Sequence, residues 1–295
     1  MALDMIIHIV WFLEKNKLYA IFKRDMVRLI FWKDVIVMIK YYDEEGFIKP
    51  TGIKFREGQD ENVILPKVAV GVFSRYLFFD VVEKYSCKEV GYISCANMER
   101  NVYILKYKNI ELTFFMAGVS GSWISADIEE LHAQGVKKVI IIGNCGVLDS
   151  KIDDCSIIIP TKGFRDEGTS YHYLPSSEMV DINPKYIDDF IKILNKYNFA
   201  YTKGYTWTTD AFYRETPKKI NYFKQRGAIC VEMEGTAIAA VCQRLNMDYF
   251  TFYYAGDNLD GVEWDERSLN GLTKIDKKKE VMLLALELAF VLNSK

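Results

Sequence analysis

Two glutamates stand in an unusual place. The segment CVEMEG (230–235) sets Glu232 and Glu234 on either side of a methionine, hard against an apolar stretch with helical periodicity. Most proteins place only core residues there, because an unpaired carboxylate is costly to bury. The segment GDN (256–258) raises a related question. It puts Asp257 just past an apolar run, in the position where a general acid is useful.

A hydroxyl and a guanidinium follow another apolar run, at the point where a helix is predicted to begin. These are Ser74 and Arg75. Free backbone N–H groups and the helix dipole favour an anion at such a site. An N-cap serine followed by an exposed arginine explains the pair equally well, so the sequence leaves both interpretations open.

Small residues and aromatics follow other predicted strands. Glycines and serines fill residues 117–122, and GNCG (143–146) contains Asn144 between two small residues. Glycines let the backbone approach a ligand closely, although they also end strands for structural reasons. Phe212 and Tyr213 are suited either to stacking on a planar ring or to the core.

The elements that position these residues alternate along the chain. Apolar, β-branched runs alternate with helical periodicities, which predicts a mostly parallel sheet covered on both faces. Ligands gather outside the carboxyl ends of such strands. The predicted strands are 67–72, 102–107, 111–116, 138–142, 156–160, 200–206 and 249–254, and the predicted helices are 76–85, 122–134, 184–197, 235–245 and 277–293.

The chain of 295 residues is long enough for one large α/β domain. We predict a single domain over residues 62–295, with a mixed, mostly parallel central sheet flanked by helices. Residues 1–61 are predicted to form an N-terminal extension packed on this domain. The apolar runs of the extension are too short to span a bilayer, which takes about 20 residues.

Charge and cysteine content narrow the possible partners. Thirty-eight basic and 40 acidic residues give a net charge of −2, so no nucleic-acid or membrane partner is expected. Six scattered cysteines without a C-x-x-C pair fit free thiols in a reducing cytoplasm. The three histidines lack metal-ligand spacing, so we expect no metal site.

Five segments together resemble the nucleoside phosphorylase/nucleosidase superfamily, which includes hexameric purine nucleoside phosphorylase, uridine phosphorylase and methylthioadenosine nucleosidase. They are GNCG (143–146), RDEGTSYHY (165–173), TTDAFY (208–213), VEMEG (231–235) and GDN (256–258), in the order and spacing of that superfamily. The resemblance runs from about residue 66 to the end of the chain. It implies the phosphorylase/hydrolase-like fold and cleavage of the N-glycosidic bond of a nucleoside.

The resemblance also implies roles for individual residues. Met233 and Glu234 resemble the pair that packs under the ribose and binds its 2′ and 3′ hydroxyls, since a carboxylate accepts two hydrogen bonds at once. Glu232 is similar to a glutamate that supports this site. Phe212 resembles the aromatic that stacks on the base. Asp257 resembles the acid of purine-cleaving members, and we expect Arg267 to assist it.

The nucleophile is less clearly specified. Phosphorolytic members carry a G-D-P-x-R loop, of which only Arg75 corresponds here, next to Ser74. Asn144 stands where a serine or threonine contacts phosphate, and Arg100 is a candidate contribution from a neighbouring subunit. These residues favour phosphorolysis to free base and ribose 1-phosphate, with inorganic phosphate as co-substrate and no other cofactor. A phosphate-independent nucleosidase and a non-catalytic nucleoside-binding protein are the alternatives.

The sequence specifies the nucleobase of the substrate and the oligomeric state in less detail than the reaction. Thr216 and Lys218 replace the glutamine and arginine with which uridine phosphorylases read a pyrimidine, whereas Asp257 favours a purine-type base. Superfamily members complete each site with residues of a twofold partner, which implies a homodimer or a hexamer (a trimer of dimers). Aromatic residues of the N-terminal extension either add to that interface or cover a sheet edge; they are Trp11, Phe12, Phe31 and Trp32.

Overall fold

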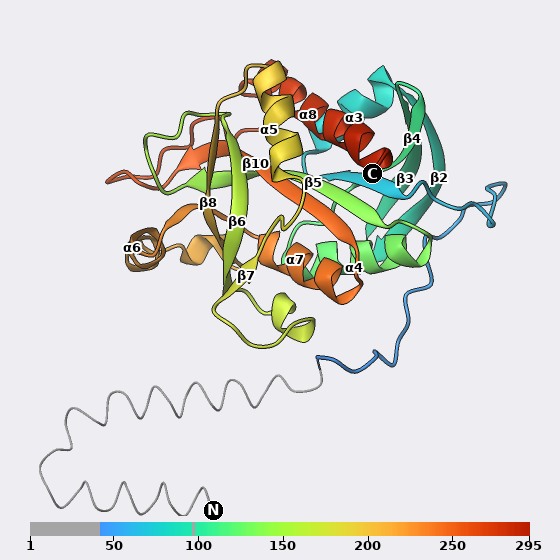
Figure 1. The fold of residues 1–295 in the computed structure, drawn as a ribbon, viewed down its shortest axis with the longest axis horizontal. Helices are drawn as coiled ribbons and strands as arrows, with labels where there is room; N and C mark the ends of the chain where they lie inside the picture. The colour runs from blue at the N-terminus through green and yellow to red at the C-terminus, as the bar shows by residue number, and fades with distance from the viewer. Residues whose placement is uncertain (1–41, 96–97) are drawn as a thin grey trace, which may run out of the picture. The chain divides into compact units, whose positions relative to one another are not determined.

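The structure is a computed structural model that describes residues 42–95 and 98–295. The predicted extension up to residue 41, with its four aromatic residues, lies outside the described residues. Residues Glu45–Lys295 form one compact unit (Figure 1). Among the described residues, no helix is long and apolar enough to cross a membrane.

The centre of the sheet is parallel, as predicted. β1 (Val68–Val72) pairs in parallel with β4 (Ile110–Met116) on one side and with β5 (Lys138–Val147) on the other, and β5 pairs in parallel with β10 (Asp248–Asn258). These strands are apolar almost throughout, because both faces of the sheet are covered. The single α/β domain and the largely parallel sheet are therefore confirmed.

Antiparallel strands extend the sheet at both ends. β2 (Ser86–Cys95) and β3 (Met98–Tyr107) continue from β4 as an antiparallel meander. The other side adds β6 (Ile157–Asp166), β7 (Met179–Asp181), β8 (Tyr201–Thr209) and β9 (Ala228–Glu232). β9 runs parallel to β8 and antiparallel to the end of β5, so the CVEMEG segment lies next to GNCG.

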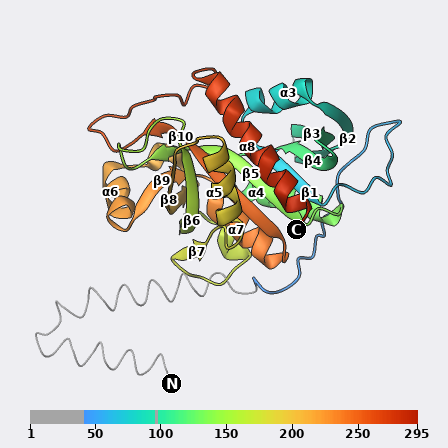
Figure 2. The ribbon, with the colours of Figure 1, turned by 45° about the horizontal axis from the view of Figure 1, so that its top comes forward.

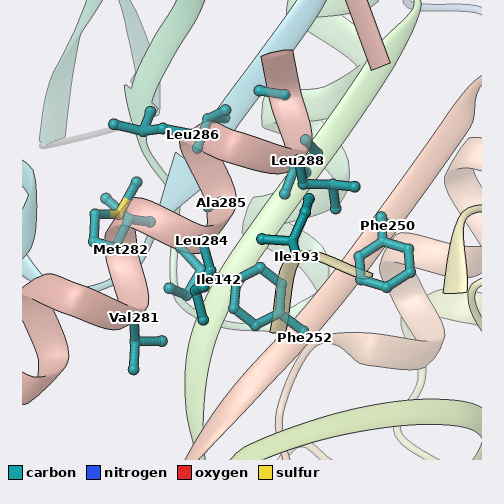
Figure 3. Close-up of a cluster of buried hydrophobic side chains, with 14 of the residues drawn as sticks. Ile142, Ile193, Phe250, Phe252, Val281, Met282, Leu284, Ala285, Leu286 and Leu288 are labelled. Atoms are coloured by element: carbon teal, nitrogen blue, oxygen red, sulfur yellow. The ribbon is translucent and has the colours of Figure 1, made fainter. Parts of the chain in front are cut away.

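Helices cover both faces of the sheet. α3 (Arg75–Lys84), α5 (Ile187–Lys196) and α8 (Ile275–Asn293) bury their apolar sides in one core cluster (Figures 1 and 2). α8 lays Leu284 and Leu288 near Ile142 of β5 and Phe252 of β10 (Figure 3). α4 (Gly121–Ala133) and α7 (Gly235–Arg244) pack in a second cluster on the opposite face.

Two strands are longer than the apolar pattern predicts. β5 runs through the whole of GNCG, and β10 runs through GDN. Their parallel pairing continues to Ala255 opposite Cys145 and resumes at Asn258 opposite Val147, so backbone hydrogen bonds carry both strands beyond their apolar runs. Asn144 and Asp257 therefore project from strand ends rather than from flexible loops.

Four strands and α-helices were not predicted from the sequence: β2, β7, β9 and α6 (Pro217–Gln225). β7 and β9 are short, and β2 and α6 are largely polar, so their apolar periodicity is weak. Thr216 begins α6 by accepting a hydrogen bond from the Lys219 backbone N–H at 3.4 Å, with proline at the first helical position. α6 forms one wall of the cavity described next.

Candidate active site

A cavity of about 940 Å³ opens at the carboxyl ends of the central strands. It lies where β1, β5 and β10 end and where β9 leads into α7. Six residues predicted from the sequence line it: Asn144, Phe212, Glu232, Met233, Glu234 and Asp257. The sheet thus brings together segments that are more than 100 residues apart in the chain.

Glu232 is held on all sides by the protein. One of its carboxylate oxygens accepts hydrogen bonds from the hydroxyls of Thr206 and Thr208, at 3.0 and 2.6 Å. The other accepts from the backbone N–H groups of Glu234 and Gly235, at 2.8 and 2.6 Å. Burial raises the pKa of Glu232, and these hydrogen bonds oppose that shift. Its acceptor capacity is filled, so it fixes the turn rather than reaching a ligand.

Glu234 faces the cavity at the start of α7. Its carboxylate accepts the backbone N–H of Ser120 at 2.8 Å and a backbone hydrogen bond from Met233. A carboxylate has about four acceptor positions, so two remain for a vicinal diol. The side chain is 7% exposed, and burial, followed by the charge of Glu232, raises its pKa to about 8.

Asp257 lines the cavity from the carboxyl end of β10. The indole N–H of Trp264 donates to its carboxylate at 2.7 Å. The other carboxylate oxygen lies against Gly146 of β5, where an added Cβ would come within 3.1 Å of it. Trp264 and Gly146 fix the aspartate in the same cavity that Phe212 and Tyr213 line.

Phe212 and Tyr213 lie at the mouth of the cavity. Their ring centroids are 4.1 Å apart, and the side chains are 51% and 88% exposed. The alternative that they belong to the core of their own chain is therefore wrong. Their exposed faces are available to a planar ligand or to a second protein surface.

The predicted phosphate contacts are dispersed. Asn144 lines the cavity, but Ser74 and Arg75 do not. Ser74 accepts the backbone N–H of Leu77 at 3.4 Å as the N-cap of α3, and the Arg75 guanidinium lies over the Phe79 ring at 5.5 Å. This is the arrangement expected for an N-cap serine followed by an exposed arginine.

Arg100 is buried and already paired. Its guanidinium donates to the Asp127 carboxylate, which also accepts the Gly118 backbone N–H at 2.8 Å. The Trp123 ring lies 4.9 Å from the guanidinium. Within the described chain Arg100 supports the turn before α4 and is 3% exposed, so it is not presented to solvent or to the cavity.

Arg267 also points elsewhere. It donates to the Ile152 carbonyl at 2.9 Å and forms an ion pair with Asp265 at 3.5 Å. It does not line the cavity that contains Asp257. Arg267 has a positive φ of 45°, and its side chain links the segment that contains Ile152 to the segment that contains Asp265.

The sequence did not indicate three carboxyl groups of the cavity, Glu215, Asp260 and Glu263, of which Glu215 is the most informative. Glu215 lines the cavity two residues after Tyr213. Burial, and then the charge of Asp257, raise its pKa to about 7. The only signal in the sequence was its place directly after the TTDAFY segment.

The cavity is strongly acidic. Among its described lining residues six are carboxylic acids and one is a lysine. The acids are Glu215, Glu232, Glu234, Asp257, Asp260 and Glu263. The lysine, Lys224, is paired with Asp260. In the described chain, no group of three or more His, Cys, Asp or Glu side chains is arranged to hold a metal ion.

Comparison with known proteins places this site in a family. A sequence profile of the phosphorylase superfamily matches residues 69–288. The chain belongs to the phosphorylase superfamily. The segments VEMEG and GDN, which contribute to the cavity, lie within the matched residues, so the resemblance inferred from the motifs is confirmed.

Individual relatives match only part of this chain, at low sequence identity. An uncharacterized protein, R802, of Acanthamoeba polyphaga mimivirus is 31% identical over 163 residues, which are 54% of this chain and 63% of that protein. A 5′-methylthioadenosine/S-adenosylhomocysteine nucleosidase of Buchnera aphidicola is 29% identical over 171 residues, 54% of this chain and 72% of the nucleosidase. The chain thus spans about two thirds of the length of these relatives.

The fold has counterparts among solved structures. Purine nucleoside phosphorylase of Toxoplasma gondii, in complex with immucillin-H, superposes with a TM-score of 0.67 at 19% identity, covering 83% of this chain and 96% of that one. At this identity the likeness concerns the fold. The profile match therefore assigns the family, and the solved structure agrees with it in fold.

Proposed function

We propose that this protein cleaves the N-glycosidic bond of a purine nucleoside and that water is the nucleophile. The observation that carries the proposal is the shared cavity of Glu234 and Asp257. A diol-binding carboxylate at one end and an acid at the other match the two ends of a nucleoside. The named activity of the Buchnera relative, on adenosine-type compounds, supports a purine.

The chemistry follows from these two groups. Breaking the C1′–N bond builds positive character on the sugar and negative charge on the departing base. Glu234 anchors the ribose hydroxyls and orients C1′, which lowers the entropic cost of attack. In its protonated form Asp257 donates a proton or hydrogen bond to the leaving base, an effect commonly worth about 10²- to 10⁴-fold.

Electrostatics favour water over phosphate as the attacking group. Phosphate carries up to two negative charges, and the one lysine of the described cavity wall, Lys224, is already paired with Asp260, so no unpaired cation among the described lining residues offsets that charge. Arg75 and Arg100 are directed away from the cavity. In hydrolysis the water oxygen adds to C1′ and loses a proton, while the base nitrogen gains one, giving free ribose and free base.

Phosphorolysis is the second candidate. The specific observation in its favour is that Ser74 and Arg75 directly follow Phe73, which lines the cavity at the N-terminus of α3. A helix N-terminus favours anions, and Arg75 is exposed rather than buried. A phosphate bound there would meet the sugar end of the cavity.

One experiment separates the two. Adenosine and inosine are incubated with the purified chain with and without inorganic phosphate, and the sugar product is identified by mass spectrometry. Hydrolysis gives equal rates and free ribose in both samples. Ribose 1-phosphate, formed only with phosphate, would overturn the water nucleophile, and no base release from any nucleoside would overturn the glycosidic activity itself.

A further inference from the structure

We propose that Glu215 is a specificity-determining residue that binds the edge of the base and selects between amino- and oxo-purines by its protonation state. This inference rests on the proposed function. It adds a recognition group that the sequence motifs did not indicate and that acts on a different part of the substrate from Glu234.

Glu215 is fixed by two local structures. Its backbone N–H donates to the Phe212 carbonyl at 3.2 Å, which closes the short 3-10 helix η2 (Phe212–Arg214). The next residue, Thr216, is the N-cap of α6. A side chain held between two such turns has a defined direction, and this one lines the cavity beside Phe212, the candidate stacking residue.

The carboxyl of Glu215 is half-buried and makes no hydrogen bond to any residue in the described part of the chain. The neighbouring cation on α6, Lys219, is committed to Asp166 at 2.6 Å. Glu215 is therefore a polar group without a protein partner, placed where the base end of a nucleoside would lie.

Two charged side chains act on Glu215, Asp257 on β10 and Lys219 on α6. Among the described residues, the other charged groups that line the same cavity are Lys224 on α6, Asp260 and Glu263 in the loop after β10, and the glutamates Glu232 and Glu234 before α7. Lys224 is neutralised by Asp260, and Lys219 by Asp166. Burial and the charge of Asp257 raise the pKa of Glu215 to about 7, and Lys219 lowers it. Both protonation states are thus populated near neutral pH.

The two states complement different purine edges. A protonated carboxyl offers one donor and one acceptor, which matches the ring nitrogen acceptor and the amino donor of a 6-aminopurine and, with donor and acceptor exchanged, the ring N–H and the carbonyl oxygen of a 6-oxopurine. An ionised carboxylate offers acceptors only, so it still accepts the ring N–H of a 6-oxopurine but loses the bond to the ring nitrogen of a 6-aminopurine. The geometry therefore accommodates both kinds of nucleoside below pH 7 and shifts the preference towards 6-oxopurine nucleosides above it.

The test compares adenosine with inosine from pH 5.5 to 8. The ratio of their kcat/KM values is the measured quantity, because effects on the shared ribose, including titration of Glu234, cancel in it. In the wild type we expect the adenosine-to-inosine ratio to fall about tenfold across this range, a size typical of one bidentate contact.

Variants make the test specific. Glu215→Gln keeps one donor and one acceptor at every pH, so its ratio should stay at the low-pH value of the wild type and not change with pH. Glu215→Ala should remove the preference and its pH dependence. Glu263→Gln, which removes a carboxylate from an exposed position of the same cavity wall, should keep the wild-type pH profile of the ratio.

Failure of this inference is distinct from failure of the proposed function. If the wild type releases base but Glu215→Gln retains the wild-type pH profile, Glu215 does not read the base. If no nucleoside is cleaved, the same pH series is carried out by calorimetry with adenine and hypoxanthine. Equal pH dependence of their affinities in the wild type and Glu215→Gln would overturn the role of Glu215 independently of catalysis.

Discussion

The Glu232 carboxylate accepts the backbone N–H of Glu234 at 2.8 Å, so one glutamate of the CVEMEG segment holds the other in place. Glu232 accepts hydrogen bonds from four donors of the protein, which fills its acceptor capacity. Glu234 keeps part of its own capacity for a ligand. Two identical side chains, two residues apart, thus have a supporting role and a binding role.

Replacing Glu234 should weaken recognition of the sugar diol. We expect Glu234→Gln to lower kcat/KM for a ribonucleoside by at least about a hundredfold above pH 8, where the carboxyl is ionised, since each charge-assisted hydrogen bond contributes about 1.5–3 kcal/mol. The loss should be smaller for the 2′-deoxynucleoside, which offers one hydroxyl fewer to the carboxylate. Equal losses for both substrates would show that Glu234 does not bind the diol.

The same substitution should change how stability depends on pH. The pKa of Glu234 is raised from 4.5 to about 8, so between these values the folded protein holds a proton that the unfolded chain releases. The contribution of Glu234 to the wild-type free energy of unfolding is complete below pH 4.5. It is lost as the pH rises from 4.5 through 8, at up to about 1.4 kcal/mol per pH unit.

Glu234→Gln lacks this titration. Relative to the wild type, its free energy of unfolding should therefore increase between pH 5 and pH 8.5 by about 2 kcal/mol or more. Urea unfolding at the two pH values measures the difference, and the comparison with the wild type removes the contributions of other titrating groups. A difference that is the same at both pH values would contradict the raised pKa.

Glu232 should matter mainly for stability. Glu232→Ala leaves four donors without their acceptor, and we expect the free energy of unfolding to fall by at least about 3 kcal/mol. Glu232→Gln should recover part of this, because an amide oxygen can accept both backbone N–H groups while its NH₂ donates to the threonine hydroxyls. Thermal unfolding of both variants tests the order.

Arg100 and Asp127 should behave as a structural pair. Arg100→Met leaves the buried Asp127 carboxylate uncompensated, so the variant should lose about 3–5 kcal/mol of stability. The double variant Arg100→Met, Asp127→Leu should regain most of it. A single variant that keeps its stability but loses a phosphate-dependent activity would instead assign Arg100 to phosphate binding.

Asp257 should act on the leaving base. Asp257→Asn keeps the shape and the contact with Trp264 but removes the acid, so purine release should fall about 10²- to 10⁴-fold. Trp264→Phe removes only the indole donor and should have a smaller effect. Undiminished release by Asp257→Asn would exclude the acid role and make Glu215, whose pKa responds to the charge of Asp257, the next carboxyl to test.

Much of this molecule could be predicted from its sequence. Apolar periodicity depends on local spacing, so β1, β5 and β10 and the helices that cover them were predicted close to their observed positions. The motif order identified the family, and the rule for strand ends brought Glu234 and Asp257 to one site. The strands and helices need only the period of side chains along the chain, whereas the family and the roles of Glu234 and Asp257 came from the resemblance of the motifs.

Only the tertiary structure decided which candidates face the cavity. The pairing of Arg100 with Asp127, the attachment of Arg267 to Ile152 and the approach of Glu215 to Asp257 join residues that are 27, 115 and 42 positions apart. Burial by distant segments also sets which carboxyls keep a proton. The local spacing of residues encodes neither the direction in which a side chain points nor its removal from water, because both depend on which distant segments pack against that side chain.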